Sequence, residues 1–100
     1  MAEPIYKMFM ARPSEHWYQL SKPEQASLLA QVNAALEEVG GKRVLYCDSV
    51  WQSEEWYGFG VERFPDLAAL QKFQHTLLDI GWLRCIESRV IVGTEANATT

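Results

Sequence analysis

One hundred residues are enough for one domain with a single buried core and too few for two such domains. The composition, 48% hydrophobic and 22% charged, excludes a disordered chain, and the net charge of −4 offers no attraction to nucleic acid or to an anionic membrane. Cys47 and Cys85 stand apart from other metal-ligating residues, which indicates neither a metal site nor a disulfide framework. The N-terminal residues lack the pattern of a signal peptide, so we expect a cytoplasmic protein without a membrane span.

The first predicted strand covers Ile5 to Arg12, a short and mostly apolar run that Pro13 ends. Farther along, Ser21 and Glu24 have the spacing of a capping box and predict the start of a helix. Apolar residues then recur at helical spacing as far as Gly40-Gly41, where the helix should end. The pattern predicts one amphipathic helix with one buried face.

The second half of the chain contains three more strands and one more helix. Two runs rich in β-branched and aromatic residues, Arg43 to Trp51 and Trp56 to Phe64, predict a β-hairpin with a four-residue polar loop. Pro65-Asp66 then opens a second helical pattern that Gly81 closes. The last predicted strand covers Arg89 to Gly93. We expect one domain over residues 1–95 and a flexible tail over residues 96–100.

This order of elements, strand–helix–strand–strand–helix–strand, predicts a ferredoxin-like α+β fold with a four-stranded antiparallel sheet and two helices on one face. The first and third strands should lie in the middle. Both sides of the first strand are apolar, with Tyr6, Met8 and Met10 on one side and Ile5, Phe9 and Ala11 on the other. Because two helices cover only one face, we expect a second copy of the chain to cover the other and form a homodimer through the sheet.

Three stretches carry a resemblance to a known superfamily: the aromatic-Leu-Ser-x-x-Glu passage from Tyr18 to Glu24, Phe64-Pro65-Asp66, and Gly81-Trp82. Through these three stretches, the chain resembles the dimeric α+β barrel superfamily over Ile5 to Gly93. The first stretch is also similar to small darcynin-like families of unknown function. The resemblance implies two ferredoxin-like protomers packed sheet to sheet. It leaves the activity open, because the superfamily includes cofactor-free quinol and anthrone monooxygenases, haem-degrading monooxygenases, isomerases, cyclases and ligand-binding regulators.

The haem-degrading branch of this superfamily uses an asparagine on the first strand, a tryptophan in the sheet and a histidine on the second helix. Here the first strand has no asparagine. At about 100° per residue, His75 falls on the side of its helix away from Leu70, Phe73 and Leu77. We therefore interpret His75 as a surface residue and expect no cofactor.

The preferred ligand site lies on the predicted hairpin. A four-residue loop places Trp51 opposite Trp56, Ser49 opposite Gly58 and Cys47 opposite Gly60. The two glycines remove side-chain volume beside two tryptophans, which predicts a recess for a flat aromatic ligand. The other interpretation is that the glycines admit a helix or mark a bulge while the tryptophans fill the core. A slip of one residue would also exchange the two faces of the hairpin.

His16 follows the first strand and is the candidate general base, with Tyr18 or Tyr57 as donors to a developing oxyanion. The alternative is an exposed histidine in a connection that Trp17 and Tyr18 pack against the core. Tyr18 and Trp82 are also candidates for contact with a ligand.

Two functional classes follow from these residues. The first is a cofactor-independent tailoring enzyme, of monooxygenase, cyclase or isomerase type, that acts on a small aromatic or polyketide-like molecule. In it, Trp51 and Trp56 stack on the substrate and His16 or Tyr57 moves a proton. The second is a non-catalytic dimeric module that binds a small ligand or serves in interaction. The sequence does not decide between them.

Overall fold

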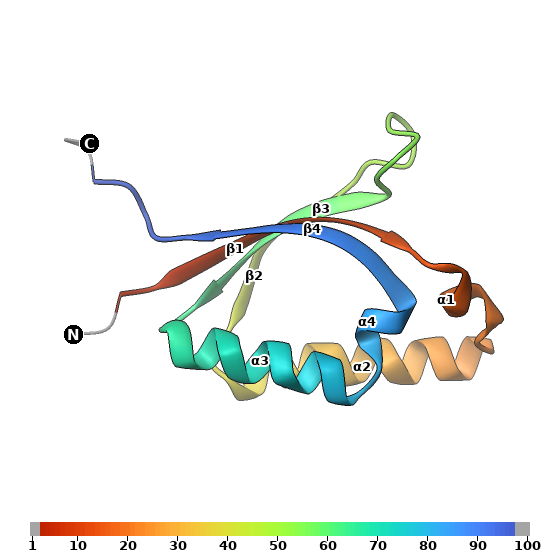
Figure 1. Ribbon diagram of the computed structural model, residues 1–100, viewed down its shortest axis with the longest axis horizontal. Helices are drawn as coiled ribbons and strands as arrows, with labels where there is room; N and C mark the ends of the chain where they lie inside the picture. Colours follow the sequence, from red (N-terminus) through yellow and green to blue (C-terminus); the bar gives the residue numbers. More distant parts are fainter. Residues whose placement is uncertain (1–2, 98–100) are drawn as a thin grey trace.

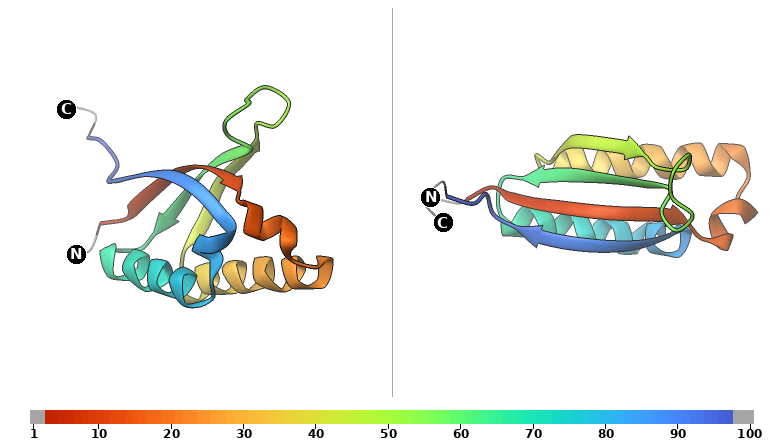
Figure 2. Two further views of the ribbon diagram at one scale, coloured as in Figure 1. Left: turned by 45° about the vertical axis from the view of Figure 1, so that its right-hand side comes forward. Right: turned by 90° about the horizontal axis from the view of Figure 1, so that it is seen from above.

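The computed structural model describes residues 3–97. The elements, in chain order, are β1 (Ile5–Pro13), α1 (Glu15–Gln19), α2 (Lys22–Glu38), β2 (Lys42–Asp48), β3 (Gly58–Phe64), α3 (Leu67–Asp79), α4 (Trp82–Cys85) and β4 (Ile86–Gly93). The sheet forms one layer, and α2 and α3 form a second layer beneath it (Figure 1). Seen from above, α2 lies under the β2 side of the sheet and α3 under the β4 side (Figure 2). The last three residues of the predicted tail lie outside the described residues.

The strand order is β2-β3-β1-β4 and every neighbouring pair is antiparallel, which confirms the predicted ferredoxin-like fold with β1 and β3 in the middle. Two short helices were not predicted. One is α1, and the other is the single turn α4, which follows Gly81 in the left-handed conformation (φ 83°). The last strand begins at Ile86 rather than at Arg89, because β4 pairs with β1 along its whole length, from Pro13–Ile86 to Tyr6–Gly93.

The two long helices begin where the sequence predicts. The Ser21 hydroxyl accepts a hydrogen bond from the backbone N–H of Glu24 (3.2 Å), and the Glu24 carboxylate accepts one from the backbone N–H of Ser21 (2.8 Å). The Asp66 carboxylate likewise accepts from the backbone N–H of Ala69 (2.8 Å). Each cap satisfies N–H groups that the first helical turn leaves unpaired.

The core lies between the sheet and the two long helices. Phe64 of β3 and Phe73 of α3 are its largest fully buried side chains, and their ring centres lie 5.3 Å apart. The helices add Val32, Ala35, Leu36, Leu70 and Leu77. On the opposite side of the sheet, Met8, Leu45, Phe59 and Ile91 are between 42% and 65% exposed, and we call this side the bare face. The chain therefore covers one face of its sheet and leaves an apolar face open.

The predicted pairing of the β2–β3 hairpin is wrong by one residue. Asp48, not Ser49, lies opposite Gly58, and Tyr46, not Cys47, lies opposite Gly60. The strand ends early because the backbone N–H of Val50 donates to the Asp48 carboxylate (2.9 Å), so residues 49–57 form a loop. Trp51 and Trp56 both lie in this loop and do not pair across the hairpin.

This shift exchanges the faces of β2. Gly58 and Gly60 are buried on the helix-covered face, so their partners Asp48 and Tyr46 point the same way. Cys47 pairs with the exposed Phe59 and therefore belongs to the bare face. A further irregularity between Arg43 and Leu45 returns Arg43 to the helix-covered face, opposite Glu62.

Candidate functional site

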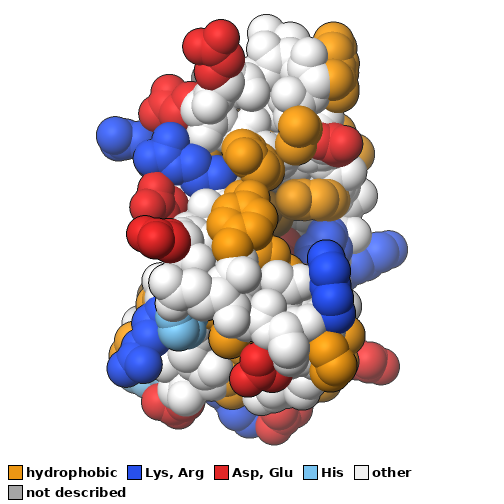
Figure 3. Space-filling view, turned by 90° about the vertical axis from the view of Figure 1, so that its right-hand side faces the viewer, with side chains coloured by type: hydrophobic (Ala, Val, Ile, Leu, Met, Phe, Trp, Pro, Cys, Tyr) orange, Lys and Arg blue, Asp and Glu red, His pale blue; other side chains and the backbone are white. Residues whose placement is uncertain are grey.

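A cavity of about 530 Å³ lies between the helix-covered face of the sheet and α2, at the end of the molecule where α1 and α4 meet. Five aromatic side chains line it: Phe9, Trp17, Tyr46, Tyr57 and Trp82. Its charged and amide side chains are Arg12, Asn33, Arg43 and Asp48. Hydrophobic side chains gather at the centre of this end of the molecule, with charged residues around them (Figure 3). The cavity thus has an apolar wall with a few polar groups, as small-molecule sites commonly do.

Two glycines of β3 let aromatic rings lie across the sheet. A Cβ atom at Gly58 would come within 2.8 Å of Cζ of Tyr46, and one at Gly60 would come within 2.9 Å of Cζ of Phe9. The two rings lie 6.0 Å apart at an interplanar angle of 24°. The rings of Phe9 and Tyr46 therefore fill the space that the two glycines leave. This differs from both expectations, an empty recess and a close approach by a helix.

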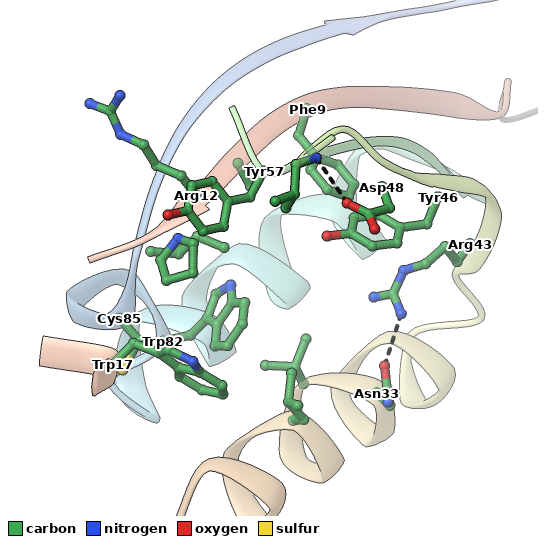
Figure 4. A pocket seen from close by; sticks show the side chains of 16 residues that line it. Phe9, Arg12, Trp17, Asn33, Arg43, Tyr46, Asp48, Tyr57, Trp82 and Cys85 are labelled. Carbon is green, nitrogen blue, oxygen red and sulfur yellow. Dashed lines mark hydrogen bonds between the residues drawn. The ribbon is translucent and has the colours of Figure 1, made fainter. Parts of the chain in front are cut away.

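The opposite wall is formed by α1 and α4. Trp17 and Trp82 meet edge to face, with ring centres 6.0 Å apart and an angle of 84°. The backbone N–H of Ser14 donates to the carbonyl of Cys85 (2.9 Å), and the Gln25 amide donates to the carbonyl of Trp17 (2.9 Å). Figure 4 shows these two indoles across the cavity from Tyr46 and Arg43. The short helices that the sequence did not predict thus hold two of the five aromatic side chains.

A row of charged residues crosses three strands beside the cavity. Glu62 of β3 lies opposite Lys7 of β1 and opposite Arg43 of β2. Its carboxylate accepts from Arg43 (3.1 Å) and pairs with the Lys7 ammonium (3.8 Å), which also donates to the Gln74 amide (2.7 Å). Lys7 and Glu62 are only 7% and 3% exposed. Burial lowers the pKa of Lys7, and the neighbouring Glu62 opposes that shift.

This row of charged residues was not predicted, because the first strand was interpreted from its apolar residues alone. The signal was present: Lys7 shares a face with Ile5 and Phe9, so it had to be buried under the helices with a partner. Asp48 was also missed as a cavity residue, because the predicted register placed it on the other face. Asn33 and Arg43 carried no motif that would have singled them out.

The predicted site residues are dispersed. Tyr57 and Trp82 line the cavity. His16 is exposed on α1 and does not line it, although its neighbour Trp17 does. Trp51 is 83% exposed in the loop, and Trp56 packs against the guanidinium of Arg12, 5.1 Å from the ring centre.

Cys47 and Ser49 contribute nothing to the cavity wall. Tyr18 is exposed on α1, and a hydrogen bond with Tyr57 raises the pKa of the Tyr18 hydroxyl. Cys85, which does line the cavity, has a thiol whose pKa is raised by burial, so it is not an activated nucleophile.

Neither histidine of the chain faces the cavity, because His16 and His75 are both exposed on helix surfaces. The cavity residues therefore do not fit a haem with a histidine ligand. Within residues 3–97, no cluster of His, Cys, Asp and Glu side chains is large enough to hold a metal ion. None of the helices within these residues has the length and hydrophobicity that a bilayer span requires.

Solved structures with similar folds support this architecture. The chain superposes on a protein of unknown function from Rhodopseudomonas palustris with a TM-score of 0.66 and 18% identity, over 97% of this chain and 85% of that one. A mutant chlorite dismutase from Candidatus Nitrospira defluvii gives a TM-score of 0.76 at 13% identity, over 99% of this chain and 42% of that one. SnoaB, a cofactor-independent oxygenase from Streptomyces nogalater, gives 0.52 at 13% identity, over 95% and 93%.

No protein-family model matches the sequence, and no curated protein is similar to it by sequence. The identities to the solved structures are low, so these neighbours establish a shared fold and leave activity to the site itself.

Proposed function

We propose that this ferredoxin-like chain binds a small aromatic or polyketide-like molecule in the cavity beneath its sheet and acts on it without a cofactor. One observation carries the proposal. Five aromatic side chains from separate parts of the chain converge on one cavity of about 530 Å³, which is large enough for a ligand of two or three fused rings. Aromatic walls favour flat ligands through stacked and edge-to-face contacts.

The reaction that fits these residues is removal of a proton next to a carbonyl group. The Asp48 carboxylate takes the proton, and the electron pair of the broken C–H bond moves toward the carbonyl oxygen to form an enolate. The Tyr57 hydroxyl donates a hydrogen bond to that oxygen. Monooxygenase, cyclase and isomerase types of tailoring reaction can all begin with this step. His16 takes no part, since it is exposed outside the cavity.

Exchange of the acidic methylene hydrogens of anthrone in D₂O, followed by NMR, tests this function. We expect the protein to accelerate exchange, and Asp48→Asn to slow the catalysed rate at least tenfold. His16→Ala should leave the rate unchanged. If anthrone binds without faster exchange, the protein is a non-catalytic binding module. If neither anthrone nor a quinone of similar size binds, the proposed function is overturned.

We also propose that the bare face is the interface of a homodimer. Its exposed side chains, Met8, Leu45, Phe59 and Ile91, come from all four strands. A contiguous apolar surface of this kind is costly to leave in water, and a second copy offers a surface of the same shape and chemistry. The cavity lies on the other side of the sheet, so dimer formation would leave it accessible.

A further inference from the structure

The charged row beside the cavity contains more positive than negative charge. Lys7 and Arg43 share a single carboxylate, that of Glu62, and the other contacts of these two cations are with the neutral amides of Gln74 and Asn33. The ion pairs of the described residues bring no second carboxylate to either cation. With both cations protonated, the row carries a net charge of about +1. Lys7 and Glu62 are buried, whereas the Arg43 side chain is 35% exposed.

Arg43 is the member of this row that reaches the cavity. Its guanidinium projects from β2 toward α2, on the side opposite Trp17 and Trp82 (Figure 4). One N–H donates to Glu62 (3.1 Å) and another to Asn33 (3.0 Å). A guanidinium has five N–H donors, and the remaining ones have no protein acceptor among residues 3–97. Glu62 and Asn33 hold the group in place, and a smaller cavity of about 90 Å³ lies behind it.

The carboxylate of the cavity lies at a distance from this cation. Asp48 is five residues from Arg43 along β2, which at about 3.3 Å per residue separates their backbones by roughly 16 Å. Asp48 accepts a hydrogen bond from the backbone of Val50 and makes no ion pair with Arg43 within the described residues. The cavity wall therefore has one carboxylate, Asp48, and two guanidinium groups. Arg12 is paired with Glu87 (2.8 Å), whereas Arg43 keeps N–H donors for a ligand.

We infer that the cavity selects aromatic molecules with an anionic oxygen, a carboxylate or an acidic phenol or enol, and that Arg43 binds this oxygen while the aromatic walls hold the rings. This inference rests on the proposed function, since it names the class of molecule that the same cavity takes. An anion at Arg43 balances the excess charge of the row. It also fixes the direction in which a flat ligand lies, because a guanidinium can bind a carboxylate with two parallel hydrogen bonds.

Calorimetric titration with 2-naphthoate and 2-naphthamide tests the inference, because the two probes share a ring system and differ in charge. We expect naphthoate to bind at least tenfold more tightly than naphthamide. Arg43→Gln should abolish this preference while naphthamide binding stays within about threefold of its original affinity. Arg43→Lys should restore part of the preference, and Arg84→Gln, an exposed arginine on α4 outside the cavity, should leave it unchanged.

The possible outcomes distinguish a failure of this inference from a failure of the proposed function. Equal binding of the two probes to the unaltered protein overturns the inference and leaves the proposed ligand cavity standing, and this comparison needs no variant to fold. A preference for naphthoate that Arg43→Gln does not change also overturns it. Failure of both probes, together with failure of anthrone and quinone to bind, overturns the proposed function as well.

Discussion

Single residues decide the shape of the cavity wall. Gly60 is the clearest case: a Cβ atom there would meet the carbonyl oxygen of Leu45 at 2.6 Å as well as the ring of Phe9. The backbone contact cannot be relieved by a rotamer change, so the strand itself would have to move. An aromatic ring lying flat on a strand thus requires glycine beneath it.

We expect Gly60→Ala to lower the free energy of unfolding by about 1–3 kcal/mol, because the added methyl group overpacks a closed space. Urea unfolding at equilibrium measures the change. Gly93→Ala is the matched control, since nothing lies within 4 Å of a Cβ atom at that strand glycine, and it should change stability by no more than about 0.5 kcal/mol. Equal effects of the two variants would show that the close contacts at Gly60 do not matter.

The buried Lys7 links stability to pH. Its pKa lies below the usual 10.5 in the folded protein, chiefly because burial disfavours the ammonium. Between the folded pKa and 10.5, the unfolded chain therefore holds more protons at this residue than the folded one. The contribution of Lys7 to the free energy of unfolding therefore increases as the pH rises through that window and decreases as the pH falls.

Comparison with Lys7→Met isolates this effect from other groups that titrate at high pH. Urea unfolding of both proteins between pH 7 and pH 10.5 should show the unaltered protein gaining stability relative to Lys7→Met as the pH rises. A difference in stability that stays constant over this range would contradict the lowered pKa of Lys7.

At the level of elements, helix α2 depends on its first turn. The reciprocal hydrogen bonds between Ser21 and Glu24 satisfy two N–H groups and set the point at which the helix begins. Farther along the same helix, Asn33 accepts a hydrogen bond from Arg43 (3.0 Å).

Ser21→Ala should destabilise the protein by about 1 kcal/mol, and Ser21→Asp should recover most of that loss, because aspartate is also a favourable capping residue. Thermal unfolding measures both. Ser27→Ala, an exposed serine inside the same helix, should be nearly neutral. If Ser21→Ala proves as mild as Ser27→Ala, the capping box contributes little to stability.

At the level of the whole molecule, the central question is what covers the bare face. The aromatic Phe59 lies on central strand β3 and is 42% exposed. In a dimer packed sheet to sheet, such a residue would lose its remaining contact with water. A charge introduced there would therefore be buried without a partner.

Sedimentation at micromolar concentration should show a dimer for the unaltered protein and a monomer for Phe59→Glu. Leu78→Glu is the matched control, because Leu78 is also an exposed apolar residue but lies on helix α3. It should leave the dimer intact. A monomeric unaltered protein, or a dimer that Phe59→Glu does not weaken, would contradict the proposed interface.

The sequence by itself determined the order of strands and long helices, the helix caps and the apolar faces, because each depends on residues close together in the chain. The cavity depended on tertiary structure. The early end of β2 at Asp48 and the irregularity beside Arg43 shift its pairing, and a shift of one residue reverses every side chain of a strand. That shift turned Tyr46 and Asp48 toward the helices. Helices α1 and α4 are too short to show helical periodicity in the sequence, and they place Trp17 and Trp82 in the cavity wall.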